Sequence, residues 1–334
     1  MQIGVDLMGS DRSPFLLFQA IEEAIQHFPF VHWIVFLTQN AWDDIQGAYS
    51  SAHHPAISCC IVPEVIEMHE EPLLALRQKK FSSLINGLKK LKKNQIQGFV
   101  STGNTGALIA GATLSIPLLP GVQRPALLAT LPTQKGEVAI IDVGGNVLCK
   151  ANHLMQFAYM GVAYKQCLDG LQLPRVGLLN IGIESKKGTV EVRRAYEVLQ
   201  QKASEGKFIF VGNIEGRELF QGEVDVLVTD GFTGNVLIKT SEGIASFMLK
   251  QLKQVLTQLH TQEQQAIFEP FHRQFNHEVY NGALLCGVNK VAVKCHGQSS
   301  PQGLLTGIRQ AIRLIQNNFI DQMTVQLKII QQKN

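Results

Sequence analysis

Short apolar runs rich in Val, Ile and Leu alternate along the chain with longer amphipathic segments. Most of these runs do not alternate with polar residues, which is typical of strands buried on both faces of a mainly parallel sheet. The expected strands are Ile3–Asp6, Val31–Leu37, Ile57–Val62, Gly98–Val100, Ala126–Leu131, Val138–Val143, Arg175–Asn180, Phe208–Val211 and Val224–Val228. The expected helices are Pro14–Phe28, Pro72–Lys93, Thr105–Ile116, His153–Leu171, Thr189–Ala203 and Val236–Leu259. This alternation predicts an α/β fold with a mostly parallel sheet in three α/β/α layers.

No linker or compositional break divides the 334 residues, so we expect a single α/β domain over residues 1–334. A hydrophobic content of 45% with 17% charged residues excludes a disordered chain. The net charge of +3 is too small to indicate a nucleic-acid-binding protein. The N-terminus has no basic segment, and the longest apolar stretch, Ala107–Val122, contains two prolines. We therefore expect neither a signal peptide nor a membrane span, and a cytoplasmic protein.

Most of the expected strands end in a loop that combines glycine with Asp, Asn, Thr or Ser. The six loops are Asp6–Asp11, Ser101–Gly106, Asp142–Asn146, Asn180–Gly182, Gly212–Gly216 and Thr229–Asn235. In open α/β sheets, ligands bind beyond the carboxyl ends of the strands. Glycine lets the backbone approach a ligand, and helix N-termini offer free N–H groups to anions. One such loop is explained as a turn, but six of them predict a shared polar cleft.

Several common catalytic motifs are absent from the sequence. There is no GxxxxGK[ST], GxGxxG, GxSxG or HExxH segment, and the six cysteines form no CxxC pair. These absences argue against P-loop phosphoryl transfer, ordinary dinucleotide binding, a lipase-like serine and a zinc site. We therefore expect no metal and no cofactor.

Two segments of the sequence are specific enough to indicate a family resemblance. They are Ser101-Thr102-Gly103-Asn104-Thr105-Gly106 and Asp230-Gly231-Phe232-Thr233-Gly234-Asn235. Together with Asp142–Asn146, Asn180–Gly182 and His296–Ser300, they resemble the bacterial phosphate acyltransferase family over nearly the whole chain. The resemblance implies a fold similar to isocitrate and isopropylmalate dehydrogenases and to phosphotransacetylase. It also implies transfer of a long-chain acyl group from acyl-carrier protein to inorganic phosphate, giving acyl phosphate for phospholipid synthesis. The chain departs from the family pattern at Ser10, Arg12 and Ile183, where the family usually has Gly, His and an acidic residue.

Such a reaction needs no covalent serine or cysteine, because phosphate is already an anionic nucleophile and a thiolate leaves readily. It needs groups that hold phosphate against the carbonyl and stabilise an oxyanion. The candidate catalytic residues are Lys187, His296 and Asn235. The candidate substrate-binding residues are Asp6, Asn104, Thr105, Asn146, Asn180, Asp230, Thr233 and Lys239. When each residue is taken alone, turn formation, helix capping, a structural hydrogen bond or a solvated charge explains it better than catalysis or binding does.

The segment from Arg77 to Lys93 carries seven basic residues and no acidic one. They are Arg77, Lys79, Lys80, Lys89, Lys90, Lys92 and Lys93. A solvated helix face, a docking surface for an acidic carrier protein and a contact with anionic lipid all remain open.

Two apolar stripes at helical spacing follow further along the chain. Their residues are Ile244, Met248, Leu252, Val255 and Leu259, and then Phe268, Phe271 and Phe275. Such stripes are usually core or dimer contacts. The resemblance implies a helical protrusion over residues 244–280 that serves homodimerisation and peripheral membrane contact.

The partners implied by the resemblance are acyl-carrier protein, inorganic phosphate, a second copy of the chain and a membrane-bound acyl-phosphate:glycerol-3-phosphate acyltransferase. Three alternatives stay open. The first is a phosphotransacetylase-like enzyme that uses acyl-coenzyme A. The second is a non-catalytic scaffold for lipid synthesis at the membrane, and the third is a nicotinamide dehydrogenase on a related fold.

Overall fold

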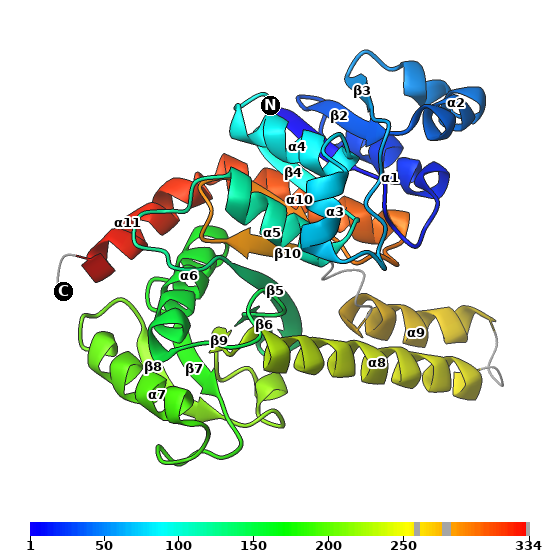
Figure 1. Cartoon of the computed structure of the whole chain (residues 1–334). Coiled ribbons are helices and arrows are strands. Elements are labelled where there is room, and N and C mark those ends of the chain that lie inside the picture. The colour runs from blue at the N-terminus through cyan, green and yellow to red at the C-terminus, as the bar shows by residue number, and fades with distance from the viewer. Residues whose placement is uncertain (257–260, 276–281, 332–334) are drawn as a thin grey trace. The chain divides into compact units, whose positions relative to one another are not determined.

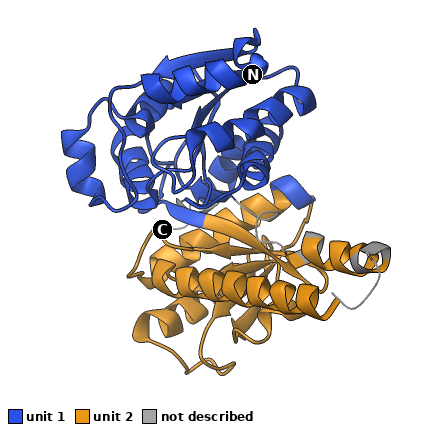
Figure 2. Cartoon of the chain, turned by 90° about the vertical axis from the view of Figure 1, so that its right-hand side faces the viewer, with its two compact units in different colours: residues 1–127, 167–169, 281–334 blue, residues 128–166, 170–280 orange. Residues whose placement is uncertain are grey.

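The computed structural model of the chain describes residues 1–256, 261–275 and 282–331 (Figure 1). The chain forms two compact units (Figure 2). Unit 1 comprises residues 1–127, 167–169 and 281–334, and unit 2 comprises residues 128–166 and 170–280. Among the described residues, no helix has both the length and the apolarity that crossing a bilayer requires.

Unit 1 is built on a mostly parallel sheet. Its strands lie in the order β3 (Ile57–Ile61), β2 (His32–Leu37), β1 (Gln2–Asp6), β4 (Gly98–Ser101), β11 (Val291–Lys294) and β10 (Ala283–Cys286). Only the β10–β11 pair in this set is antiparallel. Its helices are α1 (Pro14–His27), α2 (Gln39–Ala48), α3 (Pro72–Gln78), α4 (Ser83–Lys92), α5 (Thr105–Ser115), α10 (Pro301–Gln316) and α11 (Phe319–Gln331), with a 3-10 turn at Ser50–His53.

Helices cover both faces of the unit 1 sheet. Successive residues of a strand point to opposite faces. A Cβ on Gly98 would lie 2.8 Å from Ile315 of α10, whereas the ring of the next residue, Phe99, lies against Gly87 of α4. The helices α10 and α4 therefore pack on opposite faces, and the sheet between them is buried on both sides. This arrangement explains why the strands of this unit are continuous apolar runs in the sequence.

Unit 2 carries the second set of strands. They lie in the order β5 (Ala126–Thr133, beginning in unit 1), β6 (Gly136–Ile141), β9 (Val226–Val228), β7 (Arg175–Leu179) and β8 (Ile209–Ile214). The β5–β6 pair is antiparallel and the other three pairs are parallel. Its helices are α6 (Ala151–Asp169, with its last three residues assigned to unit 1), α7 (Val190–Ala203), α8 (Gly231–Leu256) and α9 (Thr261–Phe275), with a 3-10 turn at Leu219–Gln221.

The predicted α/β class with a mostly parallel sheet is confirmed. All nine expected strands are present, with ends shifted by a few residues. The expected helix Pro72–Lys93 is wrong as one element, because residues 79–82 leave the helix to meet Glu64. Ser82 forms a parallel bridge with Glu64, and the Phe81 N–H donates to Glu64 Oε2 at 2.8 Å. Ser82 then precedes a new helix, α4.

The helical pair α8–α9 contains the described part of the expected protrusion, and its two helices lie side by side (Figure 1). Several large apolar side chains on this pair are solvent-exposed. They are Ile244, Phe247, Met248 and Val255 on α8, and Ile267, Phe271 and Phe275 on α9. Leu259 lies outside the described residues, as do positions 257–260 and 276–280 of the predicted protrusion. Dimer and membrane contacts of this segment remain predictions.

Candidate functional site

Three strands of unit 1 end side by side in polar residues. In the register of the sheet, Ser101 at the end of β4 is the partner of both Asp6 on β1 and Lys294 on β11. All three side chains are buried. The Ser101 hydroxyl donates to Asp6 Oδ2 at 2.9 Å, and the Gly103 N–H donates to Ser101 Oγ at 3.1 Å. This network fixes the start of the loop after β4.

Burial raises the pKa of Asp6 from 3.8 to about 6. Hydrogen bonds from Ser83, Ser101 and the Met8 N–H favour the ionised carboxylate and oppose this increase, as does the nearby charge of Lys294. Desolvation outweighs them because the carboxyl group has no access to water. Asp6 was predicted to bind substrate, and the structure gives it hydrogen bonds that organise the loops around it.

The Lys294 ammonium donates to the carbonyl of Thr102 at 3.3 Å and to the carbonyl of Cys295. It thereby joins the loop after β4 to the loop after β11. Lys294 was not among the candidate residues predicted from the sequence. Its only sequence signal is a lysine that ends the otherwise apolar run Val291–Lys294.

His296 follows β11 in a tight turn that the first loop of the chain braces. The Gln298 N–H donates to His296 Nδ1 at 3.1 Å, so the neutral ring carries its proton on Nε2. The Ser10 hydroxyl and the Asp11 N–H both donate to the Gly297 carbonyl, at 2.7 and 2.9 Å. The Arg12 guanidinium donates to the Gln298 carbonyl at 3.5 Å. Ser10 and Arg12, two departures from the family pattern, therefore support the His296 turn.

Asn104 is the N-cap of α5, and both the oxygen and the nitrogen of its side-chain amide form hydrogen bonds. Its Oδ1 accepts the Ala107 N–H at 2.9 Å. Its Nδ2 donates to the carbonyls of Glu67, Met68 and Glu70 at 3.1–3.2 Å. The amide thus ties the segment before α3 to the N-terminus of α5, and Thr105 beside it is half-buried in the first turn.

In unit 2, the loop after β6 folds around the carboxylate of Asp142. Asp142 Oδ1 accepts the N–H groups of Gly144 and Gly145 at 3.1 and 2.8 Å, and Oδ2 accepts the Asn146 amide at 2.8 Å. The first residue of α8 packs on this loop, because the Gly231 N–H donates to the Asn146 carbonyl at 2.7 Å. Asp142 is fully buried. Asn146, predicted to bind substrate, therefore belongs to the contact between two strand-end loops.

Gly234 of α8 lies so close to this loop that a side chain cannot fit. A Cβ on Gly234 would lie 1.9 Å from the Asp142 carbonyl oxygen, a backbone atom. We expect Gly234→Ala to lower the free energy of unfolding by about 1–3 kcal/mol, measured by urea denaturation.

Gly243 provides a matched control on the same helix, because a Cβ there would meet nothing within 4 Å. Gly243→Ala should leave stability unchanged or raise it by up to about 1 kcal/mol, since alanine favours helix over glycine. Equal destabilisation by both substitutions would contradict the close packing at Gly234.

The loop after β9 and the first turns of α8 hold four of the predicted residues, with Asp230 in the loop and Thr233, Asn235 and Lys239 on the helix. Asp230 Oδ1 accepts the Thr233 N–H at 2.8 Å, and Asp230 Oδ2 accepts the Thr233 hydroxyl at 2.9 Å, so Asp230 caps the first turn of α8. Lys239 pairs with Glu242 at 3.1 Å rather than with Asp230. Asn235 is exposed, and within the described part of the chain its side-chain amide makes no hydrogen bond.

The loop after β7 presents Lys187 at the carboxyl end of the strand. The Asn180 amide donates to the Lys187 carbonyl at 3.1 Å, while Asn180 Oδ1 accepts the Ile181 N–H at 2.8 Å. These bonds close the loop, and Gly188, with φ +85°, follows Lys187 directly. The Lys187 side chain is exposed, and in the described ranges its ammonium has no hydrogen-bond or ion-pair partner. It is a solvent-accessible cation on a constrained loop.

The seven basic residues of the predicted docking surface lie in three settings. Lys79 is paired with Glu70 at 2.6 Å, and Lys90 is half-buried. The Lys89 ammonium donates to the Lys80 carbonyl at 3.0 Å and lies 5.5 Å from the centre of the Phe81 ring. The remaining cations are exposed, namely Arg77, Lys80, Lys92 and Lys93.

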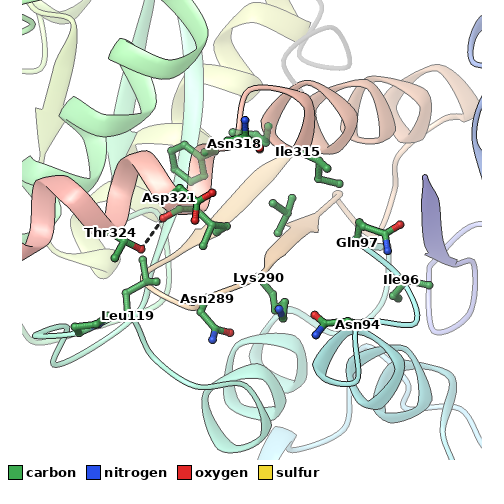
Figure 3. Close-up of a pocket in the computed structure, with 15 residues that line it drawn as sticks. Asn94, Ile96, Gln97, Leu119, Asn289, Lys290, Ile315, Asn318, Asp321 and Thr324 are labelled. Atoms are coloured by element: carbon green, nitrogen blue, oxygen red, sulfur yellow. Dashed lines mark hydrogen bonds between the residues drawn. The ribbon is translucent and has the colours of Figure 1, made fainter.

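A cavity of about 500 Å³ lies in unit 1 away from these loops (Figure 3). Asn94, Ile96 and Gln97 precede β4 and Asn289 and Lys290 precede β11, while most of the other lining residues come from the end of α10 and the start of α11. The cavity therefore lies near the amino-terminal ends of these two strands. Asn94, Asn289, Lys290 and Asp321 contribute polar groups, and Ile315 is among the apolar ones. None of the predicted site residues lines this cavity. In the described part of the chain, no cluster of His, Cys, Asp and Glu could hold a metal ion.

Comparisons with known proteins match nearly the whole chain. A family model described as "Fatty acid synthesis protein" matches residues 1–322. A phosphate acyltransferase of Chlamydia caviae is 38% identical over 317 residues, covering 94% of this chain and 95% of the relative. A phosphate acyltransferase of Thermoanaerobacter pseudethanolicus is 35% identical and covers 98% of each chain.

Solved structures with a similar fold include two phosphotransacetylases. The EutD phosphotransacetylase from Staphylococcus aureus has a TM-score of 0.58 at 16% identity, covering 97% of this chain and 94% of that one. A phosphotransacetylase from Streptococcus pyogenes has a TM-score of 0.61 at 13% identity and covers 94% of each chain. At these identities the likeness shows the fold alone, and it agrees with the fold expected from the sequence.

Proposed function

This chain belongs to the phosphate acyltransferase family, and we propose that it transfers a long-chain fatty acyl group from acyl-carrier protein to inorganic phosphate. In this reaction a phosphate oxygen attacks the thioester carbonyl carbon and the carbon–sulfur bond breaks. The proton of the monohydrogen phosphate passes to the leaving sulfur, so the products are acyl phosphate and the free thiol. The single observation that carries the proposal is the constrained loop that presents Lys187 at the end of β7.

The chemistry requires a cation for the phosphate and a donor for the developing oxyanion. We assign the cation to Lys187, whose ammonium has no ion pair with any described residue. Asn180 fixes the loop that carries Lys187, and the exposed amide of Asn235 supplies a further phosphate contact. Capping explains the positions of Asp230 and Thr233, so we give them a positioning role.

His296 is the proposed hydrogen-bond donor to the thioester carbonyl or to the leaving sulfur. Its Nδ1 accepts a backbone N–H, which directs the proton of the neutral ring to Nε2. The bracing contacts from Ser10 and Asp11 hold the turn, so the ring orientation is set before substrate binds.

We propose that the acidic carrier protein docks on the exposed cations of α3 and α4, and that a second copy of the chain covers the apolar face of α8–α9. Charge complementarity supports the first assignment, and the exposure of Ile244, Phe247 and Met248 supports the second. Cytoplasmic location, peripheral membrane contact and supply of acyl phosphate to a membrane-bound acyltransferase belong to the same proposal.

Replacing Lys89, Lys90, Lys92 and Lys93 with glutamine should lower kcat/KM for acyl-carrier protein at low salt. Exposed charges are screened beyond about 8 Å at physiological ionic strength, so the difference should shrink as salt is added. Turnover of a small acyl thioester should stay at the wild-type level. Equal efficiency of variant and wild type with the carrier at every salt concentration would place the docking surface elsewhere.

The proposed function is tested by phosphate-dependent release of carrier thiol from long-chain acyl-carrier protein. Thiol release with the carrier but much less with acyl-coenzyme A supports the assignment. A preference for acyl-coenzyme A would instead favour the phosphotransacetylase-like alternative. Absence of phosphate-dependent release from either donor would contradict phosphate acyl transfer by this chain.

A further inference from the structure

Three strand-end loops of unit 2 share a feature to which the proposed phosphate chemistry gives no role. In each loop a polar residue that organises the turn is followed within one to three positions by a large apolar side chain in solvent. Asn146 precedes Val147, Asn180 precedes Ile181 and Ile183, and Asp230 precedes Phe232. The four apolar residues are 65%, 81%, 60% and 63% exposed, in chain order. We call these four residues the apolar rim.

The three loops begin next to one another. The strands β6, β9 and β7 are neighbours and run parallel, and Val228 at the end of β9 pairs with Ile141 on one side and Leu178 on the other. Parallel strands lie about 4.8 Å apart, so loops that leave three adjacent strands at one edge remain close. The bond from the Gly231 N–H to the Asn146 carbonyl fixes the loop of Phe232 against that of Val147.

The proposed phosphate cation belongs to the same surface. A Cβ on Gly182, which separates Ile181 from Ile183, would lie 3.2 Å from Cγ of Lys187. The aliphatic stem of Lys187 therefore runs along the backbone between the two isoleucines. Residues 184–187 contain two lysines and one glutamate, so this loop has a net positive charge beside exposed apolar area.

A surface that combines a cation with exposed apolar side chains is complementary to a ligand with an anionic head and a hydrocarbon chain. Burying apolar area is favourable, and exposed apolar patches mark interaction sites. We propose that the apolar rim binds the hydrocarbon chain of the acyl group while Lys187 binds the phosphate head of the acyl phosphate. This inference rests on the proposed function for the identity of the ligand, and it adds the residues that would select for chain length.

The test uses stable n-alkyl phosphates, from ethyl to decyl phosphate, as probes below their micelle concentrations. Binding to the full-length wild type, measured by isothermal titration calorimetry, should tighten with chain length. The largest expected gain is about fourfold per methylene, which corresponds to about 0.8 kcal/mol for each buried CH₂. The double variant Ile181→Ser, Ile183→Ser should lose most of this dependence, while inorganic phosphate binds it as it binds wild type.

Leu173→Ser is the matched control. Leu173 is 50% exposed and lies before β7, at the opposite end of that strand from the apolar rim. This variant should keep the full dependence on chain length. An unchanged dependence in the double variant would overturn the inference. The inference would also be overturned if the wild type is a dimer and the double variant is a monomer that keeps the dependence on chain length. In that case a second copy of the chain would cover these residues.

The outcomes separate this inference from the proposed function. Alkyl phosphate binding is measured without turnover, so it can succeed or fail independently of phosphate-dependent thiol release. If thiol release is absent and the dependence on chain length is present, the proposed function fails and the apolar rim stands. If thiol release is present and the double variant binds alkyl phosphates as wild type does, the proposed function stands and the inference about the apolar rim fails.

Discussion

Lys187→Ala is expected to lower turnover with acyl-carrier protein about 100- to 1000-fold, the typical loss when one preorganised electrostatic group is removed from an active site. The Lys187 side chain is exposed, with no hydrogen bond or ion pair to any described residue, so the fold does not depend on its charge. The loop itself is closed through the Lys187 carbonyl, which alanine retains. Initial rates at saturating phosphate, with circular dichroism to confirm folding, provide the measurement.

Lys186→Ala is the matched control for this prediction. Lys186 is the preceding residue, is also exposed and carries the same charge, but the Asn180 amide does not fix its carbonyl. We expect its substitution to change turnover little. Similar losses of turnover in both variants would indicate that the overall positive charge of the loop matters, rather than Lys187 itself. Normal turnover of Lys187→Ala would remove Lys187 from the proposed mechanism.

Central strands such as β1, β4 and β9 could be predicted from the sequence because they are buried on both faces, which leaves an uninterrupted apolar signal. The short strands β10 and β11 were not among the expected elements, and neither were α2, α10 and α11. For α10 the signal was present, since Ser300 caps the helix, Pro301 begins it, and buried residues recur at Leu304, Leu305, Ile308 and Ile312. The break between α3 and α4 had no local signal, because the bridge to Glu64 causes it.

In the candidate site, too, features set by the local sequence could be predicted, whereas features set by tertiary contacts could not. Polar residues at strand ends could be found in sequence, since their position follows from strand–loop order alone. Their partners could not be found. Asn104 uses its whole amide to join distant segments, and Lys294 differs from a surface lysine only through burial beside Thr102 and Cys295. The sequence pattern therefore predicts where the loops lie. Only the structure distinguishes residues whose side chains hold the loops together from residues whose polar groups remain available to a ligand.

Asp6 should make the protein less stable as pH rises. Burial raises its pKa in the folded state to about 6, from 3.8 for the unfolded chain. The folded state therefore binds this proton more tightly than the unfolded state does. The stabilisation that Asp6 provides is fully present below about pH 3.8, and it is lost as pH rises through about 6.

Over that window the expected loss is about 3 kcal/mol in the free energy of unfolding, because one pKa unit corresponds to about 1.4 kcal/mol. Urea unfolding of wild type and of Asp6→Asn between pH 4 and pH 7.5 measures it, since asparagine does not titrate. The other titrating groups contribute equally to both proteins, so their effects cancel in the difference. The stability of wild type relative to Asp6→Asn should fall steadily and level off above the folded-state pKa. A difference that stays constant would mean that Lys294 and the hydrogen bonds from Ser83 and Ser101 offset desolvation of the carboxylate, and a difference that grows with pH would mean that they outweigh it. The Asp6 network would then hold its charge at all these pH values, as an ionised anchor for the loops after β1, β4 and β11.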